Sequence, residues 1–459
     1  MAKRVHFIAV GGSVMHNLAL ALHDKGYIVT GSDDEFFEPS KSRLAAAGIL
    51  PESTGWHPER ISTDLDAVIL GMHATNDNPE LQRARELNLK IYSFPEYLYE
   101  QTADKQRIVV GGSHGKTTTT AMIMHALKNA GIKYDYMVGA QLDGFDRMVG
   151  LSADSKIAVF EGDEYLTSPL DPTSKFLHYK PNIAIITGVA WDHVNVFPTW
   201  EGYLSQFGKF ASSIVFYEQQ GGILIHCADD EGATKAADSI PSHASSVGYK
   251  ALESVVEDDT NYVIYNGKRF PVGVFGKHNM YNMHAAMLAC EQVGMAKEDF
   301  LTSMATFTGA SKRLEVLYKG TDRVAYLDFA HSPSKLTATT NAIRERYPNK
   351  RIIAVMELHT FSSLRKDFLP QYKGAMNAAD KAIVFFNPEV IAHKRLEMFD
   401  KQDVATNFAH PNLSVYTKTE ELVAELKSES YNNTVLLIMT SGNFGGVDIR
   451  TFAPELLTK

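Results

Sequence analysis

Apolar and polar positions alternate along the chain in blocks that predict strands and helices in turn. An apolar run at residues 4–10 leads into a turn of small residues, after which helical spacing continues to Gly26. A second apolar run starts at Tyr27 and ends in acidic residues. Short runs of this kind are typical of buried strands, and the segment between them has the period of a helix. The block therefore predicts a strand–helix–strand unit of the mononucleotide-binding kind.

Two further blocks repeat this alternation. Almost continuous apolar runs stand at 156–162 and 182–188 in the second block, and at 351–357 and 381–386 in the third. Such runs are typical of parallel strands that are covered on both faces. The predicted class is α/β, with three Rossmann-like or P-loop domains and mostly parallel sheets. The expected domains span residues 1–104, 105–311 and 312–459.

Composition narrows the class of partner and the compartment. With 459 residues the chain is too long for one ordinary core, and a formal charge of -9 disfavours nucleic acid as a partner. Cys227 and Cys290 are the two cysteines, far apart in the sequence, which fits a reducing compartment. The first apolar run is too short for a signal peptide or a membrane span. We expect a cytoplasmic protein with no membrane partner, as a monomer or weak homodimer.

A glycine-rich segment at residues 109–120, VVGGSHGKTTTT, resembles a phosphate-binding loop. The strict pattern GxxxxGK[ST] needs glycine where Val110 stands. The required chemistry is still present, because small residues lie between an apolar strand and a helix that can aim backbone N–H groups at phosphate oxygens. Lys116 is expected on the β- and γ-phosphates, and the Thr117 hydroxyl on magnesium. The other glycine turn does not indicate a dinucleotide site, because its GxGxxG positions are Ala9, Gly11 and Val14.

Phosphoryl transfer also needs metal ligands at the ends of neighbouring strands. Glu161 ends the run at 156–162, and His193 follows the run at 182–188. Because the carboxyl ends of parallel strands meet at one edge of a sheet, both side chains are expected at the bound phosphates. Nearby acids are equally compatible with supporting roles and with helix caps or surface charges; these are Asp163, Glu164 and Asp192.

Taken together, the motifs resemble those of the Mur ligase family, the ATP-dependent amide-forming enzymes of peptidoglycan assembly. The family loop GxxGK[ST]T is shorter than the strict pattern, and residues 112–118 fit it. Five further motifs follow in the family's order along almost the whole chain. They are EGDEY at 161–165, WDHVNVF at 191–197, GKHNMYNMHAA at 276–286, FTGASKRLE at 307–315 and DFAHSPSKL at 328–336.

The resemblance implies a set of site residues, with ATP and Mg²⁺ as the groups bound. It implies Lys116, Glu161 and His193 as catalytic residues, with Thr117 and Glu161 on one magnesium ion and His193 with Glu161 on a second. The remaining expected ATP contacts lie in the loop and in the later motifs; they are Gly112, Ser113, His114, Gly115, Thr118, Asn279, Asn282, Arg313, Asp328 and His331. The UDP part of the other substrate is expected on the first domain, at Gly11, Gly12, Ser13, His73 and Asn78.

Within the family the chain looks most like the murein peptide ligase branch. That branch joins L-alanyl-γ-D-glutamyl-meso-diaminopimelate to UDP-N-acetylmuramate through an acyl phosphate, in peptidoglycan recycling. The UDP-N-acetylmuramate:L-alanine ligases of peptidoglycan synthesis are an alternative. Two other classes stay open: a P-loop kinase, and a nucleotide-regulated binding protein without ligase chemistry.

Some positions depart from the family pattern. Gly188 replaces an asparagine, Ala190 replaces an acid, Leu327 stands where an acid often precedes DFAH, and Lys312 replaces an arginine. These departures leave the expected metal ligands intact. Some members carry a carbamoylated lysine after the Asp-His motif, but the matching position here is Phe207, so that modification is not expected.

Overall fold

The computed structural model describes residues 2–142, 144–257, 260–310 and 313–458. By its contacts the chain divides into two compact units. The first comprises Met1–Val189, Glu201–Lys250 and His284–Ser303, and the second comprises Ala190–Trp200, Ala251–Met283 and Met304–Lys459. The expected boundary between residues 311 and 312, and with it Lys312, lies outside the described residues. Among the described residues, no helix is long and apolar enough to cross a membrane.

The N-terminal part of the first unit holds a parallel sheet in the order β2-β1-β3-β4. Its strands are β1 (Arg4–Ile8), β2 (Ile28–Ser32), β3 (Ala67–Leu70) and β4 (Ile91–Ser93). The helices are α1 (Ser13–Asp24), α2 (Ser40–Ala46), α3 (Pro79–Glu86) and α4 (Phe94–Glu100), with a 3-10 turn η1 at Pro58–Arg60. The strand–helix–strand opening expected from the sequence is confirmed by β1, α1 and β2.

The rest of the first unit is built on a seven-stranded sheet in the order β13-β12-β11-β5-β8-β6-β7. Only the β6–β7 pair is antiparallel among the described pairs of this sheet. The strands are β5 (Gln106–Gly111), β6 (Tyr134–Met137), β7 (Val149–Gly150), β8 (Ile157–Glu161), β11 (Ile183–Ile186), β12 (Ile223–Cys227) and β13 (Ser245–Tyr249). A small hairpin, β9 (Leu166–Ser168) with β10 (Asp171–Ser174), follows β8.

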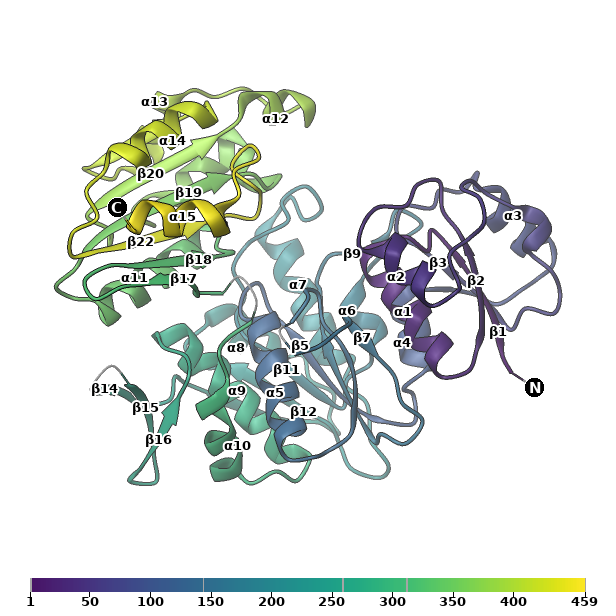
Figure 1. The fold of residues 1–459 in the computed structure, drawn as a ribbon. Coiled ribbons are helices and arrows are strands. Elements are labelled where there is room, and N and C mark those ends of the chain that lie inside the picture. Colours follow the sequence, from purple (N-terminus) through teal and green to yellow (C-terminus); the bar gives the residue numbers. More distant parts are fainter. Residues whose placement is uncertain (1, 143, 258–259, 311–312, 459) are drawn as a thin grey trace. The chain divides into compact units, whose positions relative to one another are not determined.

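Helices accompany this sheet along the chain (Figure 1). They are α5 (Lys116–Asn129), α6 (Lys175–His178), α7 (Trp200–Ser212), α8 (Glu231–Ala237) and α10 (Lys297–Ser303), while α9 (Lys277–Gln292) begins in the second unit and ends in the first. The order of the sheet places β5 between β11 and β8. Because all three run parallel, the residues that follow them share one edge of the sheet. The segments after β5, β8 and β11 therefore come together, as the apolar runs predicted.

The second unit holds a six-stranded sheet in the order β17-β18-β22-β19-β20-β21, with β17 as an antiparallel edge strand. The strands are β17 (Glu315–Lys319), β18 (Val324–Asp328), β19 (Arg351–Leu358), β20 (Lys381–Phe386), β21 (Leu413–Tyr416) and β22 (Thr434–Met439). The helical segments are α11 (Pro333–Arg346), η3 (Ser362–Leu364), η4 (Lys366–Tyr372), α12 (Pro388–His393), α13 (Lys401–Phe408), α14 (Thr419–Ser428) and α15 (Ile449–Leu457).

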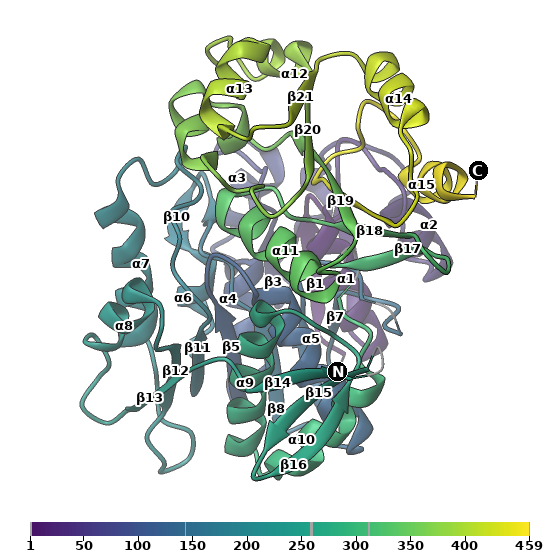
Figure 2. The ribbon, with the colours of Figure 1, turned by 90° about the vertical axis from the view of Figure 1, so that its left-hand side faces the viewer.

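Both faces of this sheet are covered. Ala354 and Met356 of β19 belong to one apolar cluster, together with residues of α11 and α13. Ile353 and Val355, which point to the opposite face, belong to a second cluster with residues of α14 and α15. Figure 1 shows α14 and α15 along the sheet, and Figure 2 shows α11 beside it. Burial on both faces explains the continuous apolar runs, and the predicted α/β class with mostly parallel sheets is confirmed.

One element of the second unit was not expected from the sequence. The strands β14 (Ser254–Glu257), β15 (Thr260–Tyr265) and β16 (Lys268–Val272) form an antiparallel sheet, and the short 3-10 helix η2 spans Met304–Thr306. Asn266 and Gly267, both with positive φ, make the turn between β15 and β16. An Asn-Gly pair between two strand-like runs is a strong hairpin signal, so this turn could have been found.

Candidate active site

The glycine-rich loop joins the end of β5 to the start of α5, and its backbone requires glycine at two positions. Gly112 has a φ of +138°, and a Cβ atom there would lie 2.0 Å from the Thr187 hydroxyl oxygen. Gly115 has a φ of +78° and precedes the first helical residue, Lys116. Residues with a Cβ atom rarely adopt such φ values, so both glycines are needed for the loop to turn directly into the helix. The shortened loop therefore connects β5 to α5 without the extra residue of the strict GxxxxGK[ST] pattern.

The residues just after β11 hold this loop. The Ser113 backbone N–H donates to the Gly188 carbonyl at 2.9 Å, and the Thr187 hydroxyl donates to the His114 carbonyl. A Cβ atom on Gly188 would lie 2.6 Å from the His114 ring. Buried hydrogen bonds of this kind fix the loop against the neighbouring strand before any ligand binds. A glycine-rich loop that runs directly into the N-terminus of α5 is an arrangement that suits an anion.

Lys116 is paired with a buried carboxylate. Its Nζ donates to the Gly112 carbonyl at 2.6 Å and to Glu164 Oε2 at 2.7 Å. The Lys116 side chain is 14% exposed and that of Glu164 is fully buried. Burial alone would lower the pKa of Lys116, but the charges of Glu164, Asp163 and Glu161 outweigh it and raise that pKa above its ordinary value. The lysine therefore carries its positive charge at the mouth of the loop.

The structure brings Thr117 and Glu161 together. The Thr117 hydroxyl donates to Glu161 Oε1 at 2.8 Å, and Glu161 Oε2 accepts the Gly139 backbone N–H at 2.8 Å. Glu161 is the last residue of β8, beside β5 in the sheet. Hydroxyl and carboxylate oxygens are the ligands that Mg²⁺ prefers, so this pair fits a magnesium ion. Their expected role as metal ligands stays a prediction.

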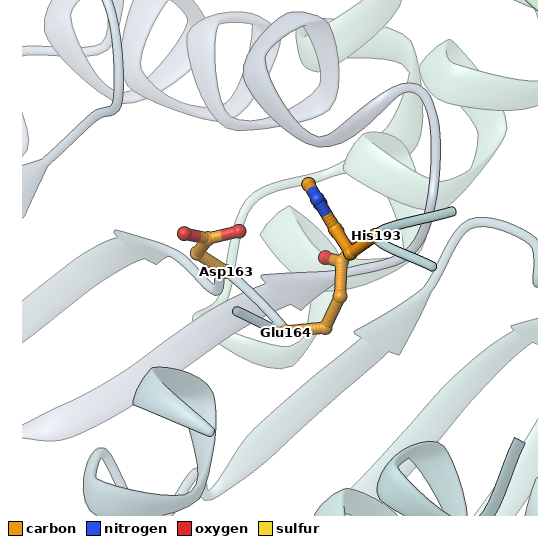
Figure 3. A group of neighbouring side chains, drawn as sticks. All are labelled: Asp163, Glu164 and His193. Atoms are coloured by element: carbon orange, nitrogen blue, oxygen red, sulfur yellow. The ribbon is translucent and has the colours of Figure 1, made fainter. Parts of the chain in front are cut away.

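Asp163, Glu164 and His193 are neighbouring side chains in the described part of the chain (Figure 3). Each offers one ligand atom, and these atoms lie within 4.8 Å of one another. His193 stands in the segment between β11 and α7, which is anchored at both ends by those elements. The sequence left Asp163 and Glu164 open between supporting roles and surface charges, and the geometry makes both candidates for a second cation site.

The acid nearest the surface of this group has its own cation. Lys175 Nζ lies 2.9 Å from Asp163 Oδ2. Burial raises the pKa of Asp163, but Lys175 and Lys116 overcome that effect, so the pKa is lowered below its ordinary value. Asp163 is therefore charged at neutral pH, as a metal ligand has to be.

Two expected adenine contacts lie on α9. Asn279 and Asn282 are buried, and the Asn279 amide donates to the Phe275 carbonyl at 2.8 Å. That bond ties the first turn of α9 to the residue two positions before the helix. The expected contacts with adenine stay predictions.

The residues expected at the ribose end lie around the end of β18. Asp328 accepts the backbone N–H of Leu314, just before β17, and that of Ala330, two residues further on, each at 2.8 Å. The guanidinium of Arg313 lies over the Phe329 ring at 5.0 Å. Burial lowers the pKa of His331 to about 3, which keeps this imidazole neutral. The expected contacts of Arg313, Asp328 and His331 with the nucleotide stay predictions.

The residues expected to bind the UDP part are used in different ways. The Gly11 N–H donates to Asp33 Oδ2 at 2.7 Å, and Gly12 precedes the first residue of α1, Ser13. His73 is exposed. Asn78 is the N-cap of α3, where its side-chain oxygen accepts the N–H groups of the second and third helical residues, each at 3.0 Å. Asn78 thus has a structural role that the sequence reasoning did not assign to it.

Asp33 was missed by the sequence reasoning. It follows β2, is 8% exposed and binds the Gly11 turn. Burial raises its pKa to about 6. An acid at the end of the second strand of a strand–helix–strand unit is a signal that the sequence contains. It was not used, because the glycine pattern that normally accompanies it is broken here.

Comparisons with known proteins agree with this arrangement over the whole length of the chain. The family model described as "Mur ligase family, catalytic domain" matches residues 4–106, "Mur ligase middle domain" matches 110–290, and "Mur ligase, glutamate ligase domain" matches 312–442.

Individual relatives are of two kinds. The chain is 28% identical to a UDP-N-acetylmuramate–L-alanyl-γ-D-glutamyl-meso-2,6-diaminoheptandioate ligase of Haemophilus influenzae, with 97% of each protein covered. It is 30% identical to a UDP-N-acetylmuramate–L-alanine ligase of Lactiplantibacillus plantarum, with 95% of each covered. The crystal structure of a UDP-N-acetylmuramate-alanine ligase of Thermotoga maritima has the same fold, with a TM-score of 0.69, 22% identity and 99% of each chain covered.

The family resemblance carried by the motifs is therefore confirmed by full-length relatives. The shortened phosphate loop, its paired lysine and the acids after β8 stand where one family model matches without a break. The chain belongs to the Mur ligase family, whose members are ATP-dependent amide ligases that form ADP.

Proposed function

We propose that this protein joins UDP-N-acetylmuramate to the free amine of a peptide, L-alanyl-γ-D-glutamyl-meso-diaminopimelate, at the expense of ATP. The observation that carries the proposal is the phosphate loop, in which Lys116 and Thr117 stand beside the acids that follow β8. The similarity to the H. influenzae tripeptide ligase over 97% of the chain supports the choice of amine. The cytoplasmic location and the monomeric or weakly dimeric state expected from the sequence stay predictions.

The proposed reaction has two steps. The muramate carboxylate attacks the γ-phosphorus of ATP, forming an acyl phosphate and releasing ADP. The amine nitrogen then attacks the acyl carbon, the amide bond forms, phosphate leaves and the nitrogen loses a proton. Lys116 places a positive charge where negative charge builds on the transferring phosphoryl oxygens, which lowers the barrier of the first step.

Magnesium would supply further positive charge to the same phosphoryl oxygens. Thr117 and Glu161 would hold one ion, and the acids beside His193, with that imidazole, a second, because hydroxyl and carboxylate oxygens are the donors that Mg²⁺ prefers. The loop N–H groups and the α5 N-terminus would orient the phosphates.

Ligation of L-alanine is the second candidate function. A relative of that specificity is 30% identical over 95% of the chain, so both amines have support of the same kind. The two candidates share the ATP site and the muramate substrate and differ only in the amine. A nucleotide-regulated binding protein would keep the ATP site and show no turnover.

The test is phosphate release from ATP with UDP-N-acetylmuramate and, in separate reactions, the tripeptide or L-alanine. Release that depends on the tripeptide supports the proposal, and its product should carry one new amide bond by mass spectrometry. Phosphate release with L-alanine but not with the tripeptide would instead support the second candidate function, ligation of L-alanine. ATP binding without release in either reaction would favour the binding protein.

A further inference from the structure

A buried chain of hydrogen bonds connects the phosphate loop to α7. Tyr203 of α7 is fully buried, and its hydroxyl lies 2.7 Å from Ser113 Oγ and 3.0 Å from Glu164 Oε1. The second oxygen of Glu164 accepts the Lys116 ammonium at 2.7 Å. The Glu164 carboxylate therefore contacts Lys116 directly and Ser113 through Tyr203, and these two loop residues stand three positions apart.

The direction of each bond in this chain follows from the groups involved. As the partner of the Lys116 ammonium, the Glu164 carboxylate only accepts hydrogen bonds. The Tyr203 hydroxyl donates its single hydrogen to Glu164, so the Ser113 hydroxyl has to donate to Tyr203. The hydrogen of the serine hydroxyl is thus directed to Tyr203.

Aromatic packing keeps Tyr203 in place. Its ring lies 5.3 Å from that of Phe207, one turn further along α7, which in turn packs against Phe176 at 5.6 Å. Phe176 stacks on Phe210 at 4.5 Å. All four residues are fully buried. The tyrosine hydroxyl therefore stands on a rigid support that does not belong to the loop itself.

We propose that Tyr203 is a positioning residue of the nucleotide site, which holds Ser113 and, through Glu164, Lys116 in the arrangement that receives the phosphates. This inference rests on the proposed ATP-dependent function. Without the hydroxyl, Ser113 loses an acceptor and Glu164 loses a donor in a buried place. The bonds from Thr187 and Gly188 still hold the loop, but the Ser113 and Glu164 side chains are held less firmly, so nucleotide binding has to supply part of their ordering.

The experiment compares Tyr203→Phe with Tyr134→Phe in the full-length protein. Tyr134 is a matched control, because its hydroxyl donates to the Met124 carbonyl of α5 at 2.8 Å, a bond that involves neither the loop nor Glu164. Hydrogen bonds to charged groups are among the stronger ones, so Tyr203→Phe is expected to raise the dissociation constant for ADP about tenfold. The KM for ATP should rise by a similar factor. The kcat should change by less than about twofold in either direction.

A double-mutant cycle separates positioning from general destabilisation. Ser113→Ala removes the other end of the same chain, so Ser113→Ala and Tyr203→Phe together should weaken ADP binding little more than either does alone. Ser113→Ala with Tyr134→Phe should show additive effects. Additive effects for the first pair, or equal losses in the two tyrosine variants, would overturn the proposal. If Tyr203→Phe does not fold, an unchanged ADP affinity in Ser113→Ala overturns it instead.

The wild-type protein distinguishes this inference from the proposed function. If it binds no ADP, the proposed function and the inference both fail. If it binds ADP and Tyr203→Phe binds equally well, the proposed function stands and only the role of Tyr203 is refuted.

Discussion

Replacing Lys116 by methionine should cost both activity and stability, for two separate reasons. The ammonium is the loop's charged group, and it is also the partner of the Glu164 carboxylate at 2.7 Å. Methionine keeps most of the aliphatic side chain, so the change removes charge without opening a large cavity. Turnover is expected to be lost, and phosphate release from ATP measures it.

The loss of stability follows from the burial of the partner. Glu164 is fully buried, and Lys116 is 14% exposed. Removing one member of a buried ion pair typically costs about 3–5 kcal/mol, because the remaining charge stays unpaired. Glu164 keeps the bond from Tyr203, so the lower end of that range, about 3 kcal/mol, applies here. In a domain of this size that corresponds to a fall in Tm of roughly 6–12 °C by calorimetry.

A second substitution separates the two effects. Glu164→Gln in the Lys116→Met background removes the carboxylate charge that has lost its lysine and keeps an oxygen that can accept from Tyr203. The double variant should regain most of the lost Tm and none of the turnover. If it melts no higher than Lys116→Met, the stability argument is wrong. If Lys116→Met still turns over ATP at the wild-type rate, the role of the lysine in phosphoryl transfer is refuted.

Three further predictions follow from other parts of the structure. Gly112→Ala, which combines a φ of +138° with a 2.0 Å contact to Thr187, should weaken ADP binding more than tenfold in titration calorimetry, since it costs roughly 2–4 kcal/mol within the loop. Asp135→Asn breaks the buried pair with Lys105, whose N–O distance is 2.6 Å, and should lower stability by about 3 kcal/mol in urea while the KM for ATP stays within twofold. Burial raises the pKa of Asp33 from 3.8 to about 6, so the folded state binds the proton more tightly than the unfolded state, and this group's contribution to stability is lost as the pH rises from 3.8 to about 6. Urea unfolding over this pH range should show a flatter profile for Asp33→Asn, and an unchanged profile would contradict the assignment.

The local pattern of apolar residues was sufficient to predict a strand where that strand is buried on both faces. The runs that became β8 and β11 are nearly all apolar, and every residue of β11 is buried. A parallel order then follows from the helices between the strands, which is why the edge carrying the loop, Glu161 and His193 could be predicted. The antiparallel strands β14 to β16 have mixed, partly exposed side chains, so no apolar run marks them.

Contacts between residues that are distant in the sequence could not be predicted from the local pattern. Glu164 and Tyr203 are 39 positions apart, and although Tyr203 differs from the buried Phe207 and Phe210 of α7 in carrying a hydroxyl, the sequence does not show which group that hydroxyl contacts. The role of Glu164 depends on which way its side chain points after β8, and a carboxylate in such a segment is as often a cap or a surface charge. Asn78 illustrates the opposite case, because a polar residue before a proline at the start of a helix is itself the signal of a cap.

Gly188, the departure from the family's asparagine, is accounted for by the loop that it supports. Its carbonyl accepts the Ser113 N–H, and a Cβ atom would lie 2.6 Å from the ring of His114 and 3.2 Å from Asp230. An asparagine at this position would therefore have to displace the His114 ring, since real Cβ atoms do not approach so closely. In this chain Gly188 leaves room for the His114 ring of the loop, so the glycine is explained by the histidine beside it. The same edge keeps Lys116, Thr117 and their acids together, which is the arrangement that phosphoryl transfer requires.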